Sequence, residues 1–301
     1  MSPADLVLPV FVKEGISAPS PIASMPGVVQ HTRDSLRNAV SEAAAAGVGG
    51  VILFGIPTVK DARGSGADAA DGIVQQALAD VVSEVGDSLV VMSDLCLDEY
   101  TDHGHCGLLT STGEVDNDST LERYASIAVA QARAGSQVIA PSGMMDGQVA
   151  AIRTSLDAQG FSDLPILSYA TKYASAFYGP FRDAAECAPA FGDRSAYQQD
   201  GARSAQEGVR EALLDIAEGA DAVMVKPALA YLDVVRAVSQ AVDVPVAAYQ
   251  VSGEFAMVEA AAAQGWIDRE RIINEQLVSI RRAGASLIFT YWATEAAGWL
   301  S

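Results

Sequence analysis

Eight short apolar runs, each rich in β-forming residues, recur along the chain and are separated by alanine-rich segments of helical character. The runs cover residues 6–12, 48–55, 89–95, 136–143, 165–170, 221–227, 244–250 and 286–291. Continuous apolar strands that alternate with helices are typical of a parallel sheet covered by helices. Eight such units in 301 residues predict an α/β fold, a (β/α)8 TIM barrel that occupies residues 1–301 as a single domain.

A doubly wound open sheet is the alternative fold, because it also alternates strands with helices. No glycine-rich dinucleotide fingerprint supports it. Half of the residues are hydrophobic, which suits one large ordered domain. The formal net charge of −19 argues against nucleic acid or an anionic membrane surface as a partner.

The cysteine count and the apolar runs also bear on location. Three cysteines cannot build a disulfide framework and suit a reducing compartment. The N-terminus lacks the form of a signal peptide, and no apolar stretch is long enough to span a bilayer. We therefore expect a soluble cytoplasmic protein with no membrane partner.

The connection between the fifth and the sixth run is too long for one helix. It covers residues 171–220 and is rich in aromatic residues, glycine, proline and arginine. A long loop at the C-terminal end of a barrel strand is a natural active-site lid, although a surface insertion is the alternative. Its Arg182 and Arg194 would either grip a carboxylate or pair with the neighbouring Asp183 and Asp193.

Two lysines stand at the ends of predicted strands, where a barrel enzyme collects its active site. Lys172 follows the fifth run and Lys226 lies at the end of the sixth. A lysine that is desolvated or near a second cation loses basicity, and the neutral amine attacks a ketone to form a Schiff base. Binding of a phosphate or a carboxylate is the alternative role, and the pattern alone leaves both open.

The segment over residues 91–109 holds two of the three cysteines and two of the three histidines. Cys96, Asp98 and Cys106 offer ligands that suit zinc, and three protein ligands leave one position open, as catalytic zinc requires. Alternatively, Cys96 is a small core residue that ends a strand, and His103 and His105 are ordinary loop residues.

Several longer motifs are specific. They are MPGVVQHT, LFGIP, KDARGSG, SDLCLDEYTDHGHCGLL, APSGMMDGQVAAIR, SYATKYASAFYGPFRDA, FGDRSAYQ, GADAVMVKPALAYLDVV, YQVSGEFAM and RAGASLIFTYW. Together they closely resemble the porphobilinogen synthase family, also called 5-aminolevulinate dehydratase, from about Leu6 to the C-terminus. The resemblance implies a barrel hydro-lyase that condenses two 5-aminolevulinate molecules into porphobilinogen with loss of two waters, in tetrapyrrole and haem biosynthesis.

The resemblance also implies roles for individual residues. Lys226 matches the lysine that forms a Schiff base with the substrate of the propionate side, and Lys172 matches the lysine that binds the substrate of the acetate side. A metal-polarised water or a nearby carboxylate, for which Asp94 is our candidate, would move protons after iminium formation. The matched binding positions are Arg182, Arg194 and Gln198 for the acetate-side carboxylate, Ser252 and Tyr291 for the propionate-side carboxylate, and Tyr178 and Phe181 for the pocket wall.

The metal positions depart from the family pattern. Zinc-dependent members have cysteine at all three positions that match Cys96, Asp98 and Cys106, whereas zinc-independent members have a non-ligand and two aspartates. This chain is a hybrid, and its ligand types and spacing favour zinc, with help from His103 or His105 an open alternative. Many members also bind an activating magnesium through a glutamate that matches Glu211, which a solvated surface charge explains equally well.

Two further departures concern the pocket and the assembly. Gly143 and Gln148 replace an acid and a base, which removes an ion pair as a unit or alters the pocket floor. The N-terminal arm that wraps a neighbouring subunit in the family is largely absent before the first run. The family octamer is therefore weighed against a dimer or a hexamer as the homo-oligomer.

Two other functions compete with the one that the resemblance implies. A Schiff-base aldolase on the same barrel needs one lysine and leaves the Cys/Asp/Cys segment unexplained. A catalytically inactive relative that binds a metal or haem is supported by Gly143 and the missing arm, although every matched catalytic position is intact.

Overall fold

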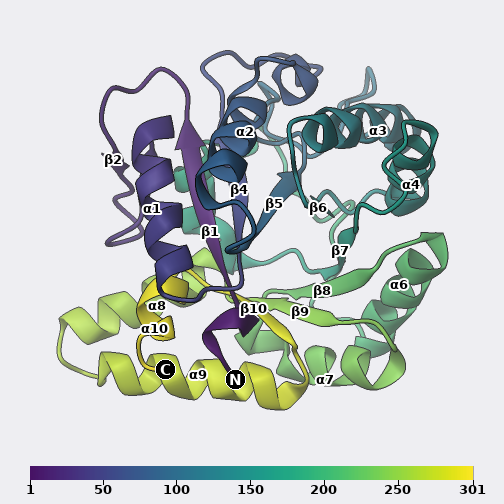
Figure 1. The fold of residues 1–301 in the computed structure, drawn as a ribbon. Coiled ribbons are helices and arrows are strands. Elements are labelled where there is room, and N and C mark those ends of the chain that lie inside the picture. Colours follow the sequence, from purple (N-terminus) through teal and green to yellow (C-terminus); the bar gives the residue numbers. More distant parts are fainter. Residues whose placement is uncertain (301) are drawn as a thin grey trace.

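The computed structural model describes residues 1–300, and each of the eight predicted runs overlaps a parallel strand (Figure 1). The strands are β1 (Leu6–Lys13), β4 (Gly50–Ile56), β5 (Val90–Leu95), β6 (Val138–Pro141), β7 (Leu167–Lys172), β8 (Ala222–Lys226), β9 (Val246–Tyr249) and β10 (Leu287–Phe289). Each strand except β6 pairs with the next one in this series, and β10 returns to pair with β1. A parallel bridge between Ile139 and Ile166 joins β6 to the start of β7 and closes the sheet. The predicted (β/α)8 barrel is confirmed.

Seven long helices connect the strands, and they surround the sheet (Figure 1). They are α1 (Arg33–Ala45), α2 (Ile73–Val85), α3 (Asn117–Arg133), α4 (Gln148–Ala158), α6 (Ala205–Glu218), α7 (Leu232–Ala241) and α9 (Arg269–Ala283). The side chains of Thr32, Asp116 and Asp268 cap α1, α3 and α9 by accepting a hydrogen bond from a backbone N–H three residues on. Within residues 1–300, none of the helices has the length and apolar character needed to cross a lipid bilayer.

The remaining elements complete the chain. They are β2 (Ser20–Pro21), β3 (Val29–His31), α5 (Gly179–Ala185), α8 (Ser252–Ala263), α10 (Ala293–Ala297) and the 3-10 turns η1 (Pro3–Asp5), η2 (Ser65–Asp68), η3 (Ala176–Tyr178) and η4 (Leu229–Tyr231). β2 and β3 form an antiparallel pair beside β1. α5 packs against α8, so the segment that follows β7 is supported by the helix that follows β9.

The barrel strands are buried on both faces. Every residue of β4 and of β7 is buried, because one face of each strand lies in the barrel interior and the other lies under the helices. This double burial explains why the strands are continuous apolar runs rather than alternating ones. Two charged residues end such strands, Lys172 in β7 and Lys226 in β8.

The long connection after β7 divides into a lid segment, residues 173–204, and the ordinary outer helix α6. The lid segment folds back onto the strand it leaves. Its Gln199 donates a backbone hydrogen bond to the carbonyl of Lys172 over 3.0 Å, and its Ala174 donates to the carbonyl of Gln199 over 2.8 Å. Arg194 and Gln198 of this segment are buried. The lid segment is therefore packed over the C-terminal end of the barrel.

Candidate active site

Lys172 and Lys226 end neighbouring strands and are Cα partners in the ladder between β7 and β8. Both side chains are buried, although lysine is rarely buried without a role. Their Nζ atoms lie 5.8 Å and 5.1 Å from the ring centroid of the same residue, Tyr169. Both amines therefore face one aromatic ring at the C-terminal end of the barrel.

An aromatic enclosure surrounds Lys226. Its Nζ lies 4.3 Å from the ring centroid of Tyr249, 5.2 Å from that of Phe181 and 5.5 Å from that of Tyr178. Burial among these rings lowers the pKa of Lys226 to about 7, and the charge of Lys172 adds to the effect. A large fraction of this amine is therefore neutral near pH 7, as nucleophilic attack on a carbonyl requires.

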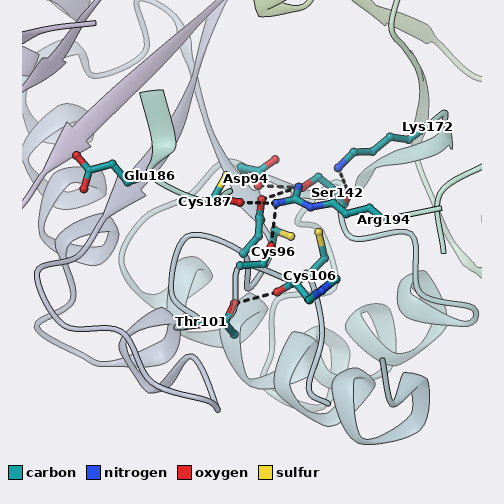
Figure 2. Close-up of polar contacts among 12 residues, drawn as sticks. Asp94, Cys96, Thr101, Cys106, Ser142, Lys172, Glu186, Cys187 and Arg194 are labelled. Atoms are coloured by element: carbon teal, nitrogen blue, oxygen red, sulfur yellow. Dashed lines mark hydrogen bonds and ion pairs between the residues drawn. The ribbon is translucent and has the colours of Figure 1, made fainter. Parts of the chain in front are cut away.

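Lys172 has a different environment, and Figure 2 shows it pointing to Ser142. Its Nζ donates a hydrogen bond of 2.6 Å to the backbone carbonyl of Ser142. Burial lowers the pKa of Lys172, but the negative charges of Cys106 and Asp98 outweigh it, so the pKa is raised. The pKa values of the two lysines are thus shifted in opposite directions, which is how one site assigns different tasks to similar groups.

Asp94 lies on β5, and its carboxylate is buried near both lysines. Its Oδ2 accepts a hydrogen bond of 2.9 Å from the Ser142 hydroxyl, whereas its Oδ1 has no hydrogen-bond partner among residues 1–300. Burial raises the pKa of Asp94 to about 6, against the opposing charges of Lys226 and Lys172. A carboxylate with a pKa near neutrality and a free oxygen is suited to accept and return a proton.

Cys96, Asp98 and Cys106 form a compact cluster of three buried donors. One ligand atom from each residue lies within 4.8 Å of the other two. Donors that share one zinc at about 2.0–2.3 Å are roughly 3.5 Å apart, so the cluster is compact enough to hold this ion. The Cys96 thiol hydrogen-bonds to Cys106 and lowers the pKa of Cys106, which favours the thiolate that metal binding needs. The residues present therefore fit zinc.

The lid segment reaches this cluster through Arg194, which Figure 2 shows extending beside Cys96 and Cys106. Its Nη1 pairs with Asp98 Oδ2 at 2.9 Å, and its Nη2 donates to the carbonyls of Gly104 and Cys187. Burial alone would raise the pKa of Asp98, but the guanidinium holds it well below the usual range. Arg194 thus pairs with a residue of the cluster.

The two histidines of this segment bind elsewhere. His105 Nδ1 lies 3.1 Å from the Tyr197 hydroxyl, and its Nε2 lies 3.1 Å from the carbonyl of Phe191. His103 Nδ1 accepts a hydrogen bond from the backbone N–H of His105. Both histidines brace the loop, and neither belongs to the cluster of donors.

The remaining lid residues carry polar atoms that have no partner. Arg182 Nε and Gln198 Nε2 are buried and make no hydrogen bond among residues 1–300, and the same holds for Arg194 Nε. Buried donors are nearly always satisfied, so three unsatisfied donors from one segment suggest a missing polar ligand. Guanidinium and amide N–H groups are donors that suit a carboxylate ligand.

Ser252 and Tyr291 are also buried and stand after β9 and β10. The Ser252 hydroxyl accepts a hydrogen bond of 2.9 Å from the backbone N–H of Phe181, which ties α8 to α5. The Tyr291 hydroxyl lies 3.3 Å from that of Tyr249, whose ring contacts Lys226. Each hydroxyl therefore lies next to the aromatic enclosure.

Glu211 occupies a second region, on α6 outside the barrel. It lines a cavity of about 1080 Å³ together with Asp146, Glu207 and Glu218. Burial raises the pKa of Glu211, and the charges of Asp146 and Glu207 add to this effect. Glu211 therefore lies among acids, and the charge of Arg210 only partly offsets them.

Sequence reasoning missed two aromatic residues of the site. Tyr169 faces both lysines, and Tyr249 lies nearer to Lys226 Nζ than Phe181 or Tyr178 does. Both lie in strands, where an aromatic residue is also an ordinary core residue. The available signal for Tyr169 was its place in the same strand as Lys172, and for Tyr249 its place at the end of a strand.

Comparisons with known proteins identify the family. The family model described as Delta-aminolevulinic acid dehydratase matches residues 1–299. The delta-aminolevulinic acid dehydratase of Streptomyces coelicolor is 61% identical over 299 residues, which cover 99% of this chain and 90% of that protein. The enzyme of Mycobacterium tuberculosis is 58% identical and covers 100% and 92%.

A solved structure is also closely similar. The delta-aminolevulinic acid dehydratase (porphobilinogen synthase) of Toxoplasma gondii, in complex with the reaction product porphobilinogen, matches with a TM-score of 0.97. It is 40% identical, and the match covers 99% of this chain and 85% of that one. The chain belongs to the delta-aminolevulinic acid dehydratase family, the hydro-lyases also called porphobilinogen synthase.

Proposed function

We propose that the enzyme joins two 5-aminolevulinate molecules through Schiff bases on Lys226 and Lys172, yielding porphobilinogen. The observation that carries this proposal is the pairing of two buried lysines across β7 and β8, both beside Tyr169. A reaction between two ketone substrates calls for two amines side by side. A Schiff-base aldolase would need only one.

The first covalent step uses the neutral amine of Lys226. The amine attacks the ketone carbon, and the resulting carbinolamine loses one water to give an iminium ion. Lys172 binds the second substrate in the same way once its own proton has left, and a second water is lost. The positive nitrogen makes the adjacent carbon of this acetate-side substrate acidic, and we assign removal of that proton to Asp94 Oδ1. The resulting carbon nucleophile attacks the iminium carbon on Lys226 and forms the carbon–carbon bond, and elimination then releases Lys226. The free amino group of the propionate-side substrate displaces Lys172 as the ring closes, and loss of a last proton gives the pyrrole.

The two substrate carboxylates need separate binding groups. For the acetate side we propose Arg182, Arg194 and Gln198, whose unpartnered nitrogens remain available. Arg194 would use Nε, because its two terminal nitrogens already hold Asp98 and two carbonyls. For the propionate side we propose the hydroxyls of Ser252 and Tyr291, and for the pocket wall Tyr178 and Phe181.

We assign a zinc site to Cys96, Asp98 and Cys106. A zinc ion held by these residues supplies a Lewis acid beside the substrate site. Asp98 keeps its negative charge through Arg194, so it offers a carboxylate oxygen at neutral pH. His103 and His105 hold the loop that carries Cys106.

We also propose a magnesium site at Glu211 and self-association of the chain. Glu211 lies in an acidic cavity, and hard divalent cations prefer carboxylate oxygens and water. Apolar side chains exposed on the outer helices, among them Leu213, Leu214 and Val278, favour contacts with further copies of the chain. We therefore propose a cytoplasmic homo-oligomer, an octamer as in the family or else a dimer or hexamer.

A turnover assay tests the proposal. The purified chain is incubated with 5-aminolevulinate, porphobilinogen is measured by colour, and the assay is repeated after chelation with zinc or magnesium returned. We expect activity that chelation removes and zinc restores. Activity indifferent to chelation would keep the reaction and reject the zinc site. Absence of product with either metal would reject the reaction for this chain.

A further inference from the structure

We infer that Tyr124 is the positioning residue that sets the geometry of the Cys/Asp/Cys cluster, and that position 143 is glycine to make room for it. The inference rests on the proposed zinc site. Tyr124 lies on α3 and is fully buried. Its hydroxyl donates a hydrogen bond of 2.7 Å to the carbonyl of Cys106 and lies 3.8 Å from Cys96 Sγ. One hydroxyl thus touches both cysteines of the cluster.

Gly143 leaves the space that this hydroxyl fills. A β-carbon placed on Gly143 would lie 1.6 Å from the Tyr124 hydroxyl oxygen, 2.5 Å from Cζ and 2.9 Å from Cε2. Gly143 does not have a positive φ, so its backbone does not demand glycine. Space is therefore the reason for glycine here. The tyrosine hydroxyl stands where the side chain of residue 143 would otherwise begin.

The same face of α3 fixes the chain beyond Cys106. One turn before Tyr124, the Thr120 hydroxyl accepts a hydrogen bond of 2.9 Å from the backbone N–H of Leu108. A β-carbon on Gly107 would lie 2.6 Å from that hydroxyl, so the backbone lies directly against the helix. The hydroxyls of Thr120 and Tyr124 on α3 therefore both hold residues 106–108. The Tyr124 hydroxyl also contacts Cys96.

This arrangement has a consequence for metal binding. Cys96 directly follows β5, whereas Cys106 lies in an irregular loop whose position is not set by a strand. The Tyr124 hydroxyl fixes the Cys106 backbone relative to Cys96, and so it fixes the separation of the two sulfurs. Groups that orient metal ligands in this way typically change metal affinity by 10- to 100-fold when they are removed.

The first test is Tyr124→Phe, which removes only the hydroxyl. Zinc affinity is measured by competition with a chromophoric chelator, and the cobalt-substituted protein is examined for its thiolate-to-metal absorption. We expect zinc binding about tenfold weaker and a changed cobalt spectrum. Tyr173→Phe is the matched control, because Tyr173 is equally buried and its hydroxyl has no partner among residues 1–300. The control should bind zinc as the unaltered protein does.

The second test concerns the shared space and needs no metal. Gly143→Ala should lower the melting temperature of the metal-free protein sharply. The new methyl group would clash with the Cζ and the hydroxyl of Tyr124, and the Tyr124 side chain is fully buried and has no free space to shift into. Tyr124→Leu is shorter and removes both atoms, so Gly143→Ala combined with Tyr124→Leu should melt higher than Gly143→Ala alone. Gly86→Ala is not a suitable control because Gly86 has a positive φ. Gly179→Ala is suitable, since nothing lies within 4 Å of its β-carbon position.

The outcomes separate this inference from the proposed zinc site. Failure of the unaltered protein to bind zinc would reject the site and, with it, the positioning role. Zinc binding that is equal in the unaltered protein and in Tyr124→Phe, with an unchanged cobalt spectrum, would reject the positioning role alone. A lower melting temperature for Tyr124→Phe with unaltered zinc affinity would show a merely structural tyrosine. Full stability of Gly143→Ala would reject the shared space.

Discussion

Lys172 and Lys226 are directly paired at the ends of β7 and β8, and the charge of Lys172 lowers the pKa of Lys226. Burial is the larger cause of that lowered pKa, and it acts on both lysines. The difference between them comes from their other neighbours. Lys172 has the negative charges of the Cys/Asp/Cys cluster, whereas Lys226 has aromatic rings on several sides. One lysine therefore prepares the other for nucleophilic attack.

The pH dependence of Schiff-base capture follows from this pairing. We expect borohydride trapping of 5-aminolevulinate on Lys226 to become faster as the pH rises through about 7, since the amine loses its proton there. Peptide mass analysis assigns the trapped lysine, and the chain has four lysines to distinguish.

Lys172→Met should move the midpoint of that trapping profile to higher pH, because the variant lacks the positive charge that lowers the pKa of Lys226. Porphobilinogen formation should be lost at the same time, since the second amine is gone. Lys60→Met, away from the strand ends, is the control and should leave the midpoint in place. A midpoint that stays or falls in Lys172→Met would contradict the pairing argument.

Asp94→Asn separates proton transfer from Schiff-base formation. We expect kcat to fall by about 10²- to 10⁴-fold, in the range of a lost general acid or base. Trapping on Lys226 should persist, with its midpoint moved to lower pH, because the charge of Asp94 raises the pKa of Lys226. Ser142→Ala is the matched variant, since it removes the hydrogen bond that lowers the pKa of Asp94 but leaves the carboxylate. Full activity of Asp94→Asn would eliminate Asp94 from the mechanism.

The sequence predicted the barrel because burial on both faces leaves a strong mark on each strand. A parallel strand that is buried on both faces, such as β4, is largely apolar, so the charged Lys172 and Lys226 stand out at the ends of β7 and β8. The Cys/Asp/Cys cluster was also visible, since Cys96 and Cys106 are separated by a short loop. These features are local, and a local pattern is what one sequence displays.

The contacts that tune the site are not local, and the sequence left them open. The pairing of Asp98 with Arg194 joins a barrel loop to the lid segment, and the neighbouring Asp193 was an equally good partner on sequence grounds. Tyr124 lies on the apolar face of an outer helix, where an aromatic residue is typical of the core. Its contact with Gly143 depends on how close α3 lies to the loop that follows β6. The spacing of the two residues in the sequence does not reveal that distance.

Glu211 offers a test of magnesium binding that is independent of turnover. We expect magnesium to raise the melting temperature of the unaltered protein and not that of Glu211→Gln, because a ligand that binds the folded state stabilises it. The effect should weaken as the pH falls, since burial and the charges of Asp146 and Glu207 raise the pKa of Glu211. Glu275→Gln, an exposed position on α9, is the control and should keep the magnesium response. An equal response in Glu211→Gln would reject the assignment.

The last prediction concerns the free energy of unfolding and follows from the buried ion pair between Asp98 and Arg194. Asp98→Asn leaves the Arg194 guanidinium buried without a carboxylate, and breaking a buried pair in this way typically costs about 3–5 kcal/mol. Urea unfolding of the metal-free protein at pH 7 measures this loss in the free energy of unfolding. Asp157→Asn breaks an exposed pair with Arg153 and should cost only about 0.5 kcal/mol.

The pH dependence of that cost has a definite sign. The pKa of Asp98 is lowered in the folded protein, so the pair contributes fully above the ordinary aspartate value of 3.8 and progressively less as the pH falls below it. The difference in the free energy of unfolding between the unaltered protein and Asp98→Asn should therefore shrink in acid.

Asp98→Cys separates the two roles of this residue. It should bind zinc more tightly, because a thiolate holds zinc better than a carboxylate does, and yet it should share the stability loss of Asp98→Asn without metal. If Asp98→Cys were as stable as the unaltered protein, the carboxylate would have no structural role beside Arg194.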